Sequence, residues 1–136
     1  MMRTRRRMLD KYAKSLEVEP EKITFNAMDE ALLKRAMAIV EKNMDNIEFS
    51  TDEFAREMNM SRSNLHLKLK AITGESTIDF IRKIRFNEAA KLLKDGRYTV
   101  AEVSTMVGFN TPSYFATSFK KYFGCLPTEY IKKSKG

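Results

Sequence analysis

The segment TIDFIRKIRFNEAAKLLKD, residues 77–95, has the spacing of a long helix with apolar side chains on two of its sides. One broad face of this helix is formed by Ile78, Ile81, Phe86, Ala89, Ala90, Leu92 and Leu93. Phe80 and Ile84 form a second face, and polar positions such as Lys83 and Asn87 separate the two. Because a helix that packs against one body needs only one apolar stripe, we expect this helix to contact two bodies.

A helix buried within a single bundle is the alternative interpretation of this segment. Its basic residues argue against full burial, because Lys and Arg are rarely buried in full. These residues are Arg82, Lys83, Arg85, Lys91 and Lys94. We therefore expect two small helical units, one before and one after residues 77–95, with the helix setting the distance between them.

Composition places the chain among small helical proteins. Its 136 residues are enough for one ordinary domain or for two very small units that share a core. Apolar residues make up 43%, while glycine (5) and proline (3) are scarce and no strongly alternating run occurs, which favours an all-α fold. The net charge of +7 and a pI near 9.5 suggest a polyanionic partner, either nucleic acid or an anionic membrane.

Several features point to the cytoplasm. No apolar run approaches the roughly 18 residues of a membrane span, so we expect no membrane contact by this segment. The N-terminal sequence is charged and lacks an apolar signal core, which argues against secretion. The single cysteine, Cys125, excludes an internal disulfide and fits a reducing compartment, where we interpret it as a small, partly buried turn residue.

Residues 1–26 are interpreted as a basic lead and linker. The run RTRRR at 3–7 leads into a short helix through Leu16, and residues 17–25 contain Pro20 and form a linker. We expect this lead to be the end of a longer chain and the globular part to occupy 27–136. The first helix of that part is predicted from about Asp29 to Asn46, with Asn26 as its cap.

Residues 50–74 have the pattern of a helix-turn-helix. Ser50 and Glu53 form a capping-box pattern that opens a short helix, and Asn59-Met60 breaks it. The second helix is predicted over 61–73, with Ser61 as its cap and Gly74 at its end. Its buried positions are Leu65, Leu69 and Ile72.

The same plan returns in residues 99–124. Thr99 and Glu102 form a capping box, Gly108-Phe109-Asn110 makes the turn, and the second helix is predicted over 111–123. Gly124 ends that helix, and a final short helix is expected over 127–133. Its aromatic residues are interpreted as core or lid and not as a platform for stacking single strands: Tyr114, Phe115, Phe119, Tyr122 and Phe123.

The two patterns form an internal repeat. Glu53 and Met58 correspond to Glu102 and Val107 at an offset of 49 residues, whereas the second helices and the tails that follow them correspond at 50. The second unit should therefore have one extra residue in its turn. Two copies are too few for a solenoid but suit a pair of similar units joined by one helix.

The second helix of each unit is the candidate for contact with DNA, because a helix-turn-helix places that helix in the major groove. Predicted base contacts are the outward residues Ser63, Asn64, His66 and Leu67 in the first unit and Pro112, Ser113, Ala116 and Thr117 in the second. The first set has more hydrogen-bonding groups, so we expect it to carry more of the polar base readout. A plain surface position is the alternative for His66.

Basic residues near these helices are predicted to contact phosphate, which supplies affinity rather than sequence choice. They are Arg62, Lys68, Lys70, Arg82, Lys83, Lys120 and Lys121. With a single histidine and no nucleophile–base pair, paired catalytic carboxylates or glycine-rich phosphate loop, we predict no catalytic residue, no metal site and no cofactor.

Residues 50–131 resemble the DNA-binding domain of AraC/XylS-type transcription regulators. The resemblance rests mainly on the second half, where the motifs are Ala90-x-Leu92-Leu93, Val100-Ala101-Glu102-Val103, Val107-Gly108-Phe109, Ser113-Tyr114-Phe115, Phe119-Lys120-Lys121-Tyr122-Phe123-Gly124 and Pro127-x-Glu129-Tyr130. The run from Met60 to Gly74 adds a narrower likeness to the output domains of hybrid two-component regulators. Two positions depart from the family pattern: Leu67 stands where arginine is frequent, and Thr77 where proline is common.

The resemblance implies about seven helices in two homeodomain-like helix-turn-helix units joined by a long central helix, with the recognition helices in successive major-groove segments. It implies a transcription regulator, in most cases an activator, that binds double-stranded promoter DNA and contacts RNA polymerase. Within a hybrid regulator, a receiver and histidine kinase module would precede this domain in the same chain. The resemblance is compatible with a homodimer of the full-length protein.

Three other interpretations compete with this hypothesis, and two of them belong to a different functional class. One alternative is a fragment of a one-component AraC-type regulator, in which a sugar-binding barrel replaces the receiver. The chain would also fit a protein-interaction module that touches DNA weakly. An enzyme is the third class, and it lacks a candidate site in this sequence.

Overall fold

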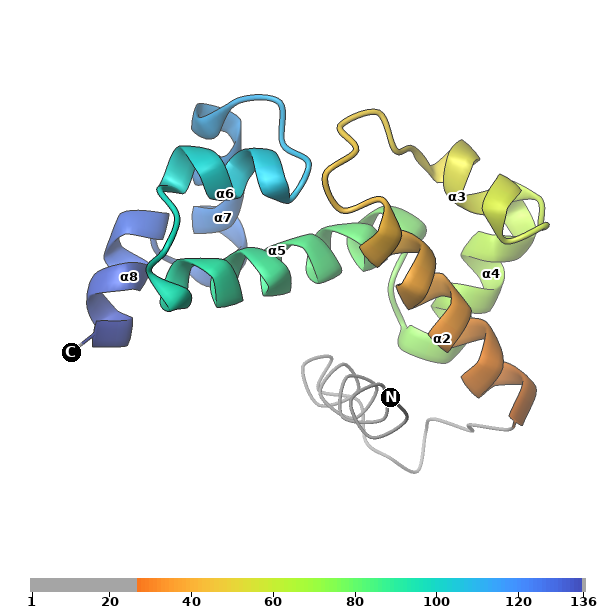
Figure 1. Ribbon diagram of the computed structural model, residues 1–136. Helices are drawn as coiled ribbons and strands as arrows, with labels where there is room; N and C mark the ends of the chain where they lie inside the picture. The colour runs from red at the N-terminus through yellow and green to blue at the C-terminus, as the bar shows by residue number, and fades with distance from the viewer. Residues whose placement is uncertain (1–26, 136) are drawn as a thin grey trace. The chain divides into compact units, whose positions relative to one another are not determined.

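The computed structural model describes residues 27–135, with side chains to 134, and all regular structure in that range is helical (Figure 1). The helices are α2 (Ala27–Lys42), α3 (Thr51–Glu57), α4 (Arg62–Thr73), α5 (Thr77–Asp95), α6 (Val100–Met106), α7 (Pro112–Phe123) and α8 (Pro127–Lys135). None of them is long and apolar enough to cross a membrane. The all-α prediction is confirmed. The expected helix through Leu16, the linker and the Asn26 cap fall outside the described residues.

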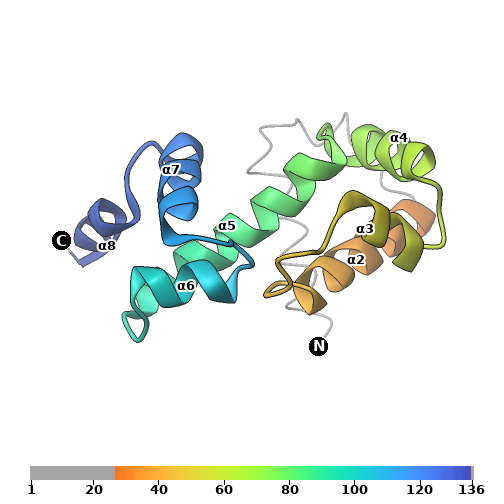
Figure 2. The same ribbon diagram turned by 90° about the horizontal axis from the view of Figure 1, so that it is seen from above.

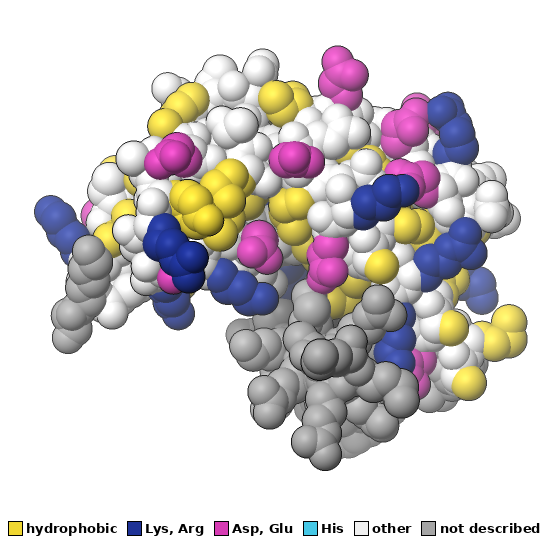
Figure 3. Space-filling view, viewed as in Figure 1, with side chains coloured by type: hydrophobic (Ala, Val, Ile, Leu, Met, Phe, Trp, Pro, Cys, Tyr) yellow, Lys and Arg dark blue, Asp and Glu magenta, His cyan; other side chains and the backbone are white. Residues whose placement is uncertain are grey.

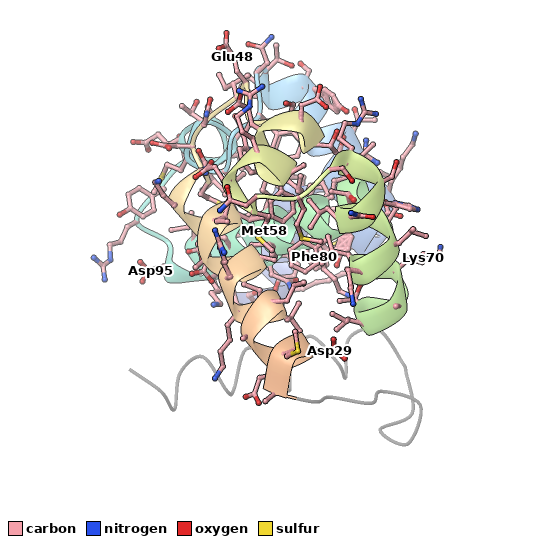
Figure 4. The ribbon with its side chains drawn as sticks, turned by 90° about the vertical axis from the view of Figure 1, so that its right-hand side faces the viewer. Asp29, Glu48, Met58, Lys70, Phe80 and Asp95 are labelled. Atoms are coloured by element: carbon pink, nitrogen blue, oxygen red, sulfur yellow. The ribbon has the colours of Figure 1, made fainter. Side chains whose placement is uncertain are left out.

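The first compact unit contains residues 27–40 and 50–80. Its core includes Leu33, Ala36, Phe54, Leu65, Leu69 and Phe80, all of them essentially inaccessible to solvent. The Phe54 and Phe80 rings stack with their centroids 5.9 Å apart. Figure 2 shows α3 and α4 beside α2, and Figure 4 shows Met58 and Phe80 directed into the space among these helices. This core holds α4 in place against the two helices that precede it.

The second unit contains residues 41–49 and 81–135. Its core consists of Phe86, Ala89, Leu93, Val103, Val107, Phe115 and Phe119. Phe86 of α5 is at the centre of an aromatic cluster, and its ring centroid lies 5.4 Å from that of Phe109 and 5.0 Å from that of Tyr122. Aromatic pairs at such distances add stabilisation beyond the area they bury. The cluster therefore fixes α7 on α5.

Helix α5 has the bounds predicted for it and serves both cores, as expected. The division runs along the helix and not between two faces, because Phe80 belongs to the first core and Phe86 to the second. The prediction that Ile78 joins the buried face was wrong, since 55% of this residue is exposed. Ile78 lies in the first turn of α5, in the part of the helix that belongs to the first unit.

The repeat is reproduced in the turns as well as in the helices. The caps of α3 and α6, Ser50 and Thr99, are 49 residues apart, and those of α4 and α7, Ser61 and Thr111, are 50 apart. The extra residue therefore lies in the second turn, as predicted. Thr99 and Glu102 form a complete capping box, with reciprocal bonds of 3.1 and 2.9 Å.

Three local predictions need correction. Helix α2 ends at Lys42 and not at Asn46, because the chain turns there with a bond from Met44 N–H to Glu41 O. Ser50 caps α3, but the Glu53 carboxylate binds Arg56 at 2.7 Å, so the expected second half of that capping box is replaced by an ion pair. Helix α8 continues to Lys135, two residues beyond its predicted end.

The argument from basic residues was also wrong in part, because Arg85 and Lys83 are buried, with 8% and 7% exposed. Arg85 lies within the second unit and donates to three backbone carbonyls. Its Nη1 binds Gly108 O at 3.2 Å, and its Nη2 binds Asn46 O at 2.9 Å and Asn43 O at 3.4 Å. Burial lowers the pKa of Arg85, but arginine starts so high that the guanidinium stays charged.

The turns of the two helix-turn-helix units each contain one residue with positive φ. In the first turn it is Asn59 (φ +56°), and at the corresponding place in the second it is Gly108 (φ +83°). A Cβ on Gly108 would lie 2.6 Å from Met44 O and 2.7 Å from Arg85 Nη1. Only glycine fits at this position, because both the backbone angle and the close approach of residues 43–46 exclude a side chain.

We predict that Gly108→Ala lowers the free energy of unfolding by about 3 kcal/mol, since a clash with backbone adds to the cost of about 1–2 kcal/mol for a left-handed alanine. Gly124→Ala is the matched control, because Gly124 has the same φ of +83° and nothing within 4 Å of the added Cβ. Urea unfolding measures both. Equal losses for the two variants would contradict the close packing around Gly108.

We predict that Arg85→Met destabilises the protein by about 3 kcal/mol, because three backbone carbonyls lose a charged donor. Arg85→Lys should be destabilised almost as much, since one ammonium cannot reach all three acceptors. Arg82→Met, three residues earlier and exposed, should change stability by less than about 0.5 kcal/mol. If Arg85→Lys kept full stability in urea, the positive charge of Arg85 would explain its contribution to stability, and the planar guanidinium with its several N–H donors would not be needed.

Candidate nucleic-acid interface

Helix α4 is fixed at both ends by its sequence. The Ser61 hydroxyl accepts from Asn64 N–H at 3.1 Å at the start, and Gly74 with φ +79° ends the helix. Leu65 and Leu69, one turn apart, are fully buried. This pair determines which face of α4 is turned toward solvent.

The opposite face of α4 is exposed at every position for which a DNA contact is predicted. These are Arg62, Ser63, Asn64, His66, Leu67, Lys68 and Lys70. Figure 4 shows Lys70 on the outer side of α4. The predicted outward placement is thus confirmed, while the contacts with bases and phosphates stay predictions.

Arg62, at the first position of α4, is linked to the preceding helix by an ion pair that sequence reasoning missed. Its Nε lies 3.3 Å from Asp52 Oδ1, and both side chains are well exposed. Such a pair adds little stability at the surface. Because it engages Nε, it leaves the two terminal nitrogens of the guanidinium available for a ligand.

Helix α7 repeats this design with different side chains. The Thr111 hydroxyl accepts from Tyr114 N–H at 3.1 Å, and Pro112 occupies the first position. Phe115 and Phe119 are buried, so α7 is anchored like α4. The predicted contact residues Pro112, Ser113, Thr117, Lys120 and Lys121 are exposed, and Ala116 is half-buried. The Thr117 hydroxyl donates to Ser113 O at 3.0 Å, which leaves its oxygen to accept from a ligand.

The α7 aromatic residues were interpreted as core or lid, and the core part of that interpretation does not hold for Tyr114, which is 51% exposed, or for Tyr122, which is 38% exposed. The Tyr114 ring makes an edge contact with Phe109 at 5.7 Å, and the rest of its surface is open. The repeat itself held the signal, because Tyr114 corresponds at an offset of 50 to Asn64, which was predicted to face outward. Tyr114 therefore joins the candidate contact residues of α7.

The charge distribution distinguishes the two helices from the rest of the surface. Neither α4 nor α7 contains an Asp or Glu, whereas α4 has Arg62, Lys68 and Lys70 and α7 has Lys120 and Lys121. On the face shown in Figure 3, by contrast, acidic and basic side chains are interspersed. An exposed helix face with cations and no carboxylates is suited to a polyanion.

The two phosphate candidates on α5 differ. Arg82 is exposed, whereas Lys83 is buried and has an interaction partner of its own. In this conformation the Lys83 ammonium is not presented to a phosphate. In the part of the chain that the structure describes, no group of three or more His, Cys, Asp or Glu side chains could hold a metal ion.

A helix-turn-helix domain family matches residues 54–133. Among curated proteins, histidine kinase P4 of Formosa agariphila is 37% identical over 96% of this chain, which corresponds to 10% of that protein. The chain likewise spans about a third of shorter regulators that it matches.

Two of the solved structures that resemble this chain illustrate the likeness. The C-terminal domain of AraT, a response regulator from Geobacillus stearothermophilus, is 30% identical with a TM-score of 0.70, covering 75% of this chain and 84% of that one. A transcriptional regulator from Chromobacterium violaceum, described as having an AraC-type DNA-binding domain, has a TM-score of 0.71 at 24% identity and covers 80% and 96% of the two chains. The second likeness concerns the fold.

Proposed function

Because the chain belongs to the AraC-type helix-turn-helix family of DNA-binding domains of transcription regulators, we propose that it reads a specific double-stranded promoter sequence through α4 and α7. The observation that carries this proposal is the pair of capped, acid-free helices, each with an exposed polar face opposite two buried anchors. Selection of binding sites from random duplexes, followed by footprinting, tests it. Two adjacent protected major-groove segments are expected, and protection independent of sequence would contradict it.

The proposed contacts divide by chemistry. Base edges are assigned to Ser63, Asn64, His66 and Leu67 of α4 and to Pro112, Ser113, Ala116 and Thr117 of α7, whose small side chains permit close approach. Phosphates are assigned to Arg62, Lys68, Lys70, Arg82, Lys120 and Lys121.

We further propose that this domain is the output part of a longer cytoplasmic regulator that contains a receiver and a histidine kinase. The support is its match to a tenth of histidine kinase P4 and its likeness to the C-terminal domain of a response regulator. An activator that contacts RNA polymerase, and acts as a dimer of the full-length protein, fits this role. Sequencing the gene upstream of Met1 tests the proposal, and a sugar-binding barrel there would favour a one-component regulator instead.

We predict that His66→Ala relaxes sequence preference at one position of the selected site, at a cost of about 1–3 kcal/mol in binding to that site. Binding to random duplex should be nearly unchanged, because no phosphate contact is lost. Competition of selected against random duplex measures the difference. Equal weakening of both duplexes by His66→Ala would make His66 a phosphate contact, and unchanged binding to both would make it a plain surface residue; either result would contradict base reading.

We predict that Lys70→Ala and Lys120→Ala each reduce the slope of log affinity against log salt by about one unit, with little change in sequence preference. These lysines occupy corresponding positions of α4 and α7, so the pair compares the two units directly. Lys34→Ala on α2, where the lysine pairs with Glu30 at 3.3 Å, is the control and should leave the slope unchanged. An unchanged slope for Lys120→Ala alone would indicate that α7 does not touch phosphate there.

A further inference from the structure

A hollow of about 750 Å³ lies beside the start of α4 in the first unit. Its polar lining consists of Thr51, Arg62, Ser63, His66, Ser76 and Thr77 and contains no carboxylate. Two acidic residues of the neighbouring turn, Glu75 and Asp79, do not line it. The hollow is therefore bordered by one guanidinium, hydroxyls and an imidazole, together with the apolar side chains of Leu65, Leu67 and Ile78.

The first turn of α5 opens onto this hollow. The Ser76 hydroxyl accepts from Asp79 N–H at 3.2 Å, and Ser76 O accepts from Phe80 N–H at 2.9 Å. The N–H groups of Thr77 and Ile78 have no acceptor among the described residues, as is usual at a helix start. Free N–H groups and the positive end of the helix dipole favour an anion here.

The Thr77 side chain gives a second and independent sign of a ligand. The residue is only 6% exposed and lines the hollow, yet its hydroxyl has no hydrogen-bond partner among the described residues. Arg85 Nε is the single buried side-chain nitrogen or oxygen among the described residues that lacks a partner, so the Thr77 oxygen is open to the hollow and not sealed inside the protein. The hydroxyl is therefore available to a ligand that enters the hollow.

We propose that the hollow binds a DNA backbone phosphate, with the Arg62 guanidinium, the Thr77 hydroxyl and the first N–H groups of α5 as ligands. Asp52 holds Arg62 through Nε at 3.3 Å and leaves the terminal nitrogens for the phosphate. The inference rests on the proposed DNA binding and adds a contact from α5 that the charged residues do not indicate. It also gives the exposed Ile78 a place at the edge of the DNA surface.

The second unit lacks this site, which makes the first unit the place to test it. At an offset of 50, Arg62 corresponds to Pro112 and Ser76-Thr77 to Leu126-Pro127. Proline has neither a hydroxyl nor an N–H. The guanidinium, the hydroxyl and one backbone donor are thus all missing from the corresponding place in the second unit.

The test is Thr77→Val, with Thr128→Val at the start of α8 as the control. Binding to a fluorescein-labelled duplex at low salt should weaken about tenfold for Thr77→Val, the loss of one charge-assisted hydrogen bond, and should not change for Thr128→Val. Stability in urea should equal or exceed that of the wild type, since the hydroxyl has no partner in the protein. Loss of stability together with affinity would indicate a structural role and overturn the proposal.

Backbone amide shifts of Thr77 and Ile78, titrated with duplex and separately with inorganic phosphate, identify the ligand. Shifts with duplex, and losses that are less than additive in Arg62→Gln/Thr77→Val, support a shared phosphate. Shifts with inorganic phosphate alone would make the hollow a free-anion site and overturn the DNA assignment. Unchanged affinity of Thr77→Val beside a wild type that binds duplex would overturn the site alone, whereas a wild type that binds no duplex would overturn the proposed function as well.

Discussion

The second unit depends on the buried guanidinium of Arg85, which binds carbonyls from two separate stretches of backbone. One stretch, residues 43–46, follows α2, and the other is the turn at Gly108. The fit between them is so close that a single methyl group on Gly108 would touch both Met44 O and the guanidinium. The guanidinium stays charged in the interior because backbone carbonyls of both stretches accept from it, and two of them, Asn43 O and Asn46 O, also accept from backbone N–H groups of their own turn. The chain between α2 and α3 is thereby made part of the unit that carries the second recognition helix.

This constraint explains how the two copies of one motif diverged. In the first unit the residue with positive φ is Asn59, which tolerates the left-handed region and is exposed. In the second unit the same place must be Gly108, because another segment is packed against it. The backbones of the two turns also differ in length, because the turn of the second unit has one more residue. Similar caps and similar anchors thus produce similar helices, while the turns are adapted to different surroundings.

Local signals in the sequence were sufficient for the helices, because caps and apolar spacing act within a few residues of each other. The bounds of α5, the Thr99 capping box and the extra turn residue were all predictable in this way. Burial of Arg85 was not, since its three partners are carbonyls, and every residue has a carbonyl. The exposure of Tyr114 could have been predicted from the repeat, in which it corresponds to the outward residue Asn64, but the aromatic residues of this helix were interpreted as one group. The periodicity of a single sequence therefore identifies buried apolar residues such as Leu65 and Leu69 well, but it identifies polar contacts between distant segments poorly.

The two recognition helices differ in a way that gives the Arg85 contact a functional meaning. Helix α4 has an arginine, a histidine and two lysines on its exposed face, and such long side chains can adjust to a base or phosphate after docking. Helix α7 has mainly short side chains at its predicted base-contact positions. If α7 binds DNA as proposed, we expect its backbone to come close to the groove, where short side chains cannot correct an error in position. A helix that reads by close fit needs a rigid support. The aromatic cluster around Phe86 and the fixed turn at Gly108 provide it, and we expect loosening of either to impair recognition by α7 more than by α4.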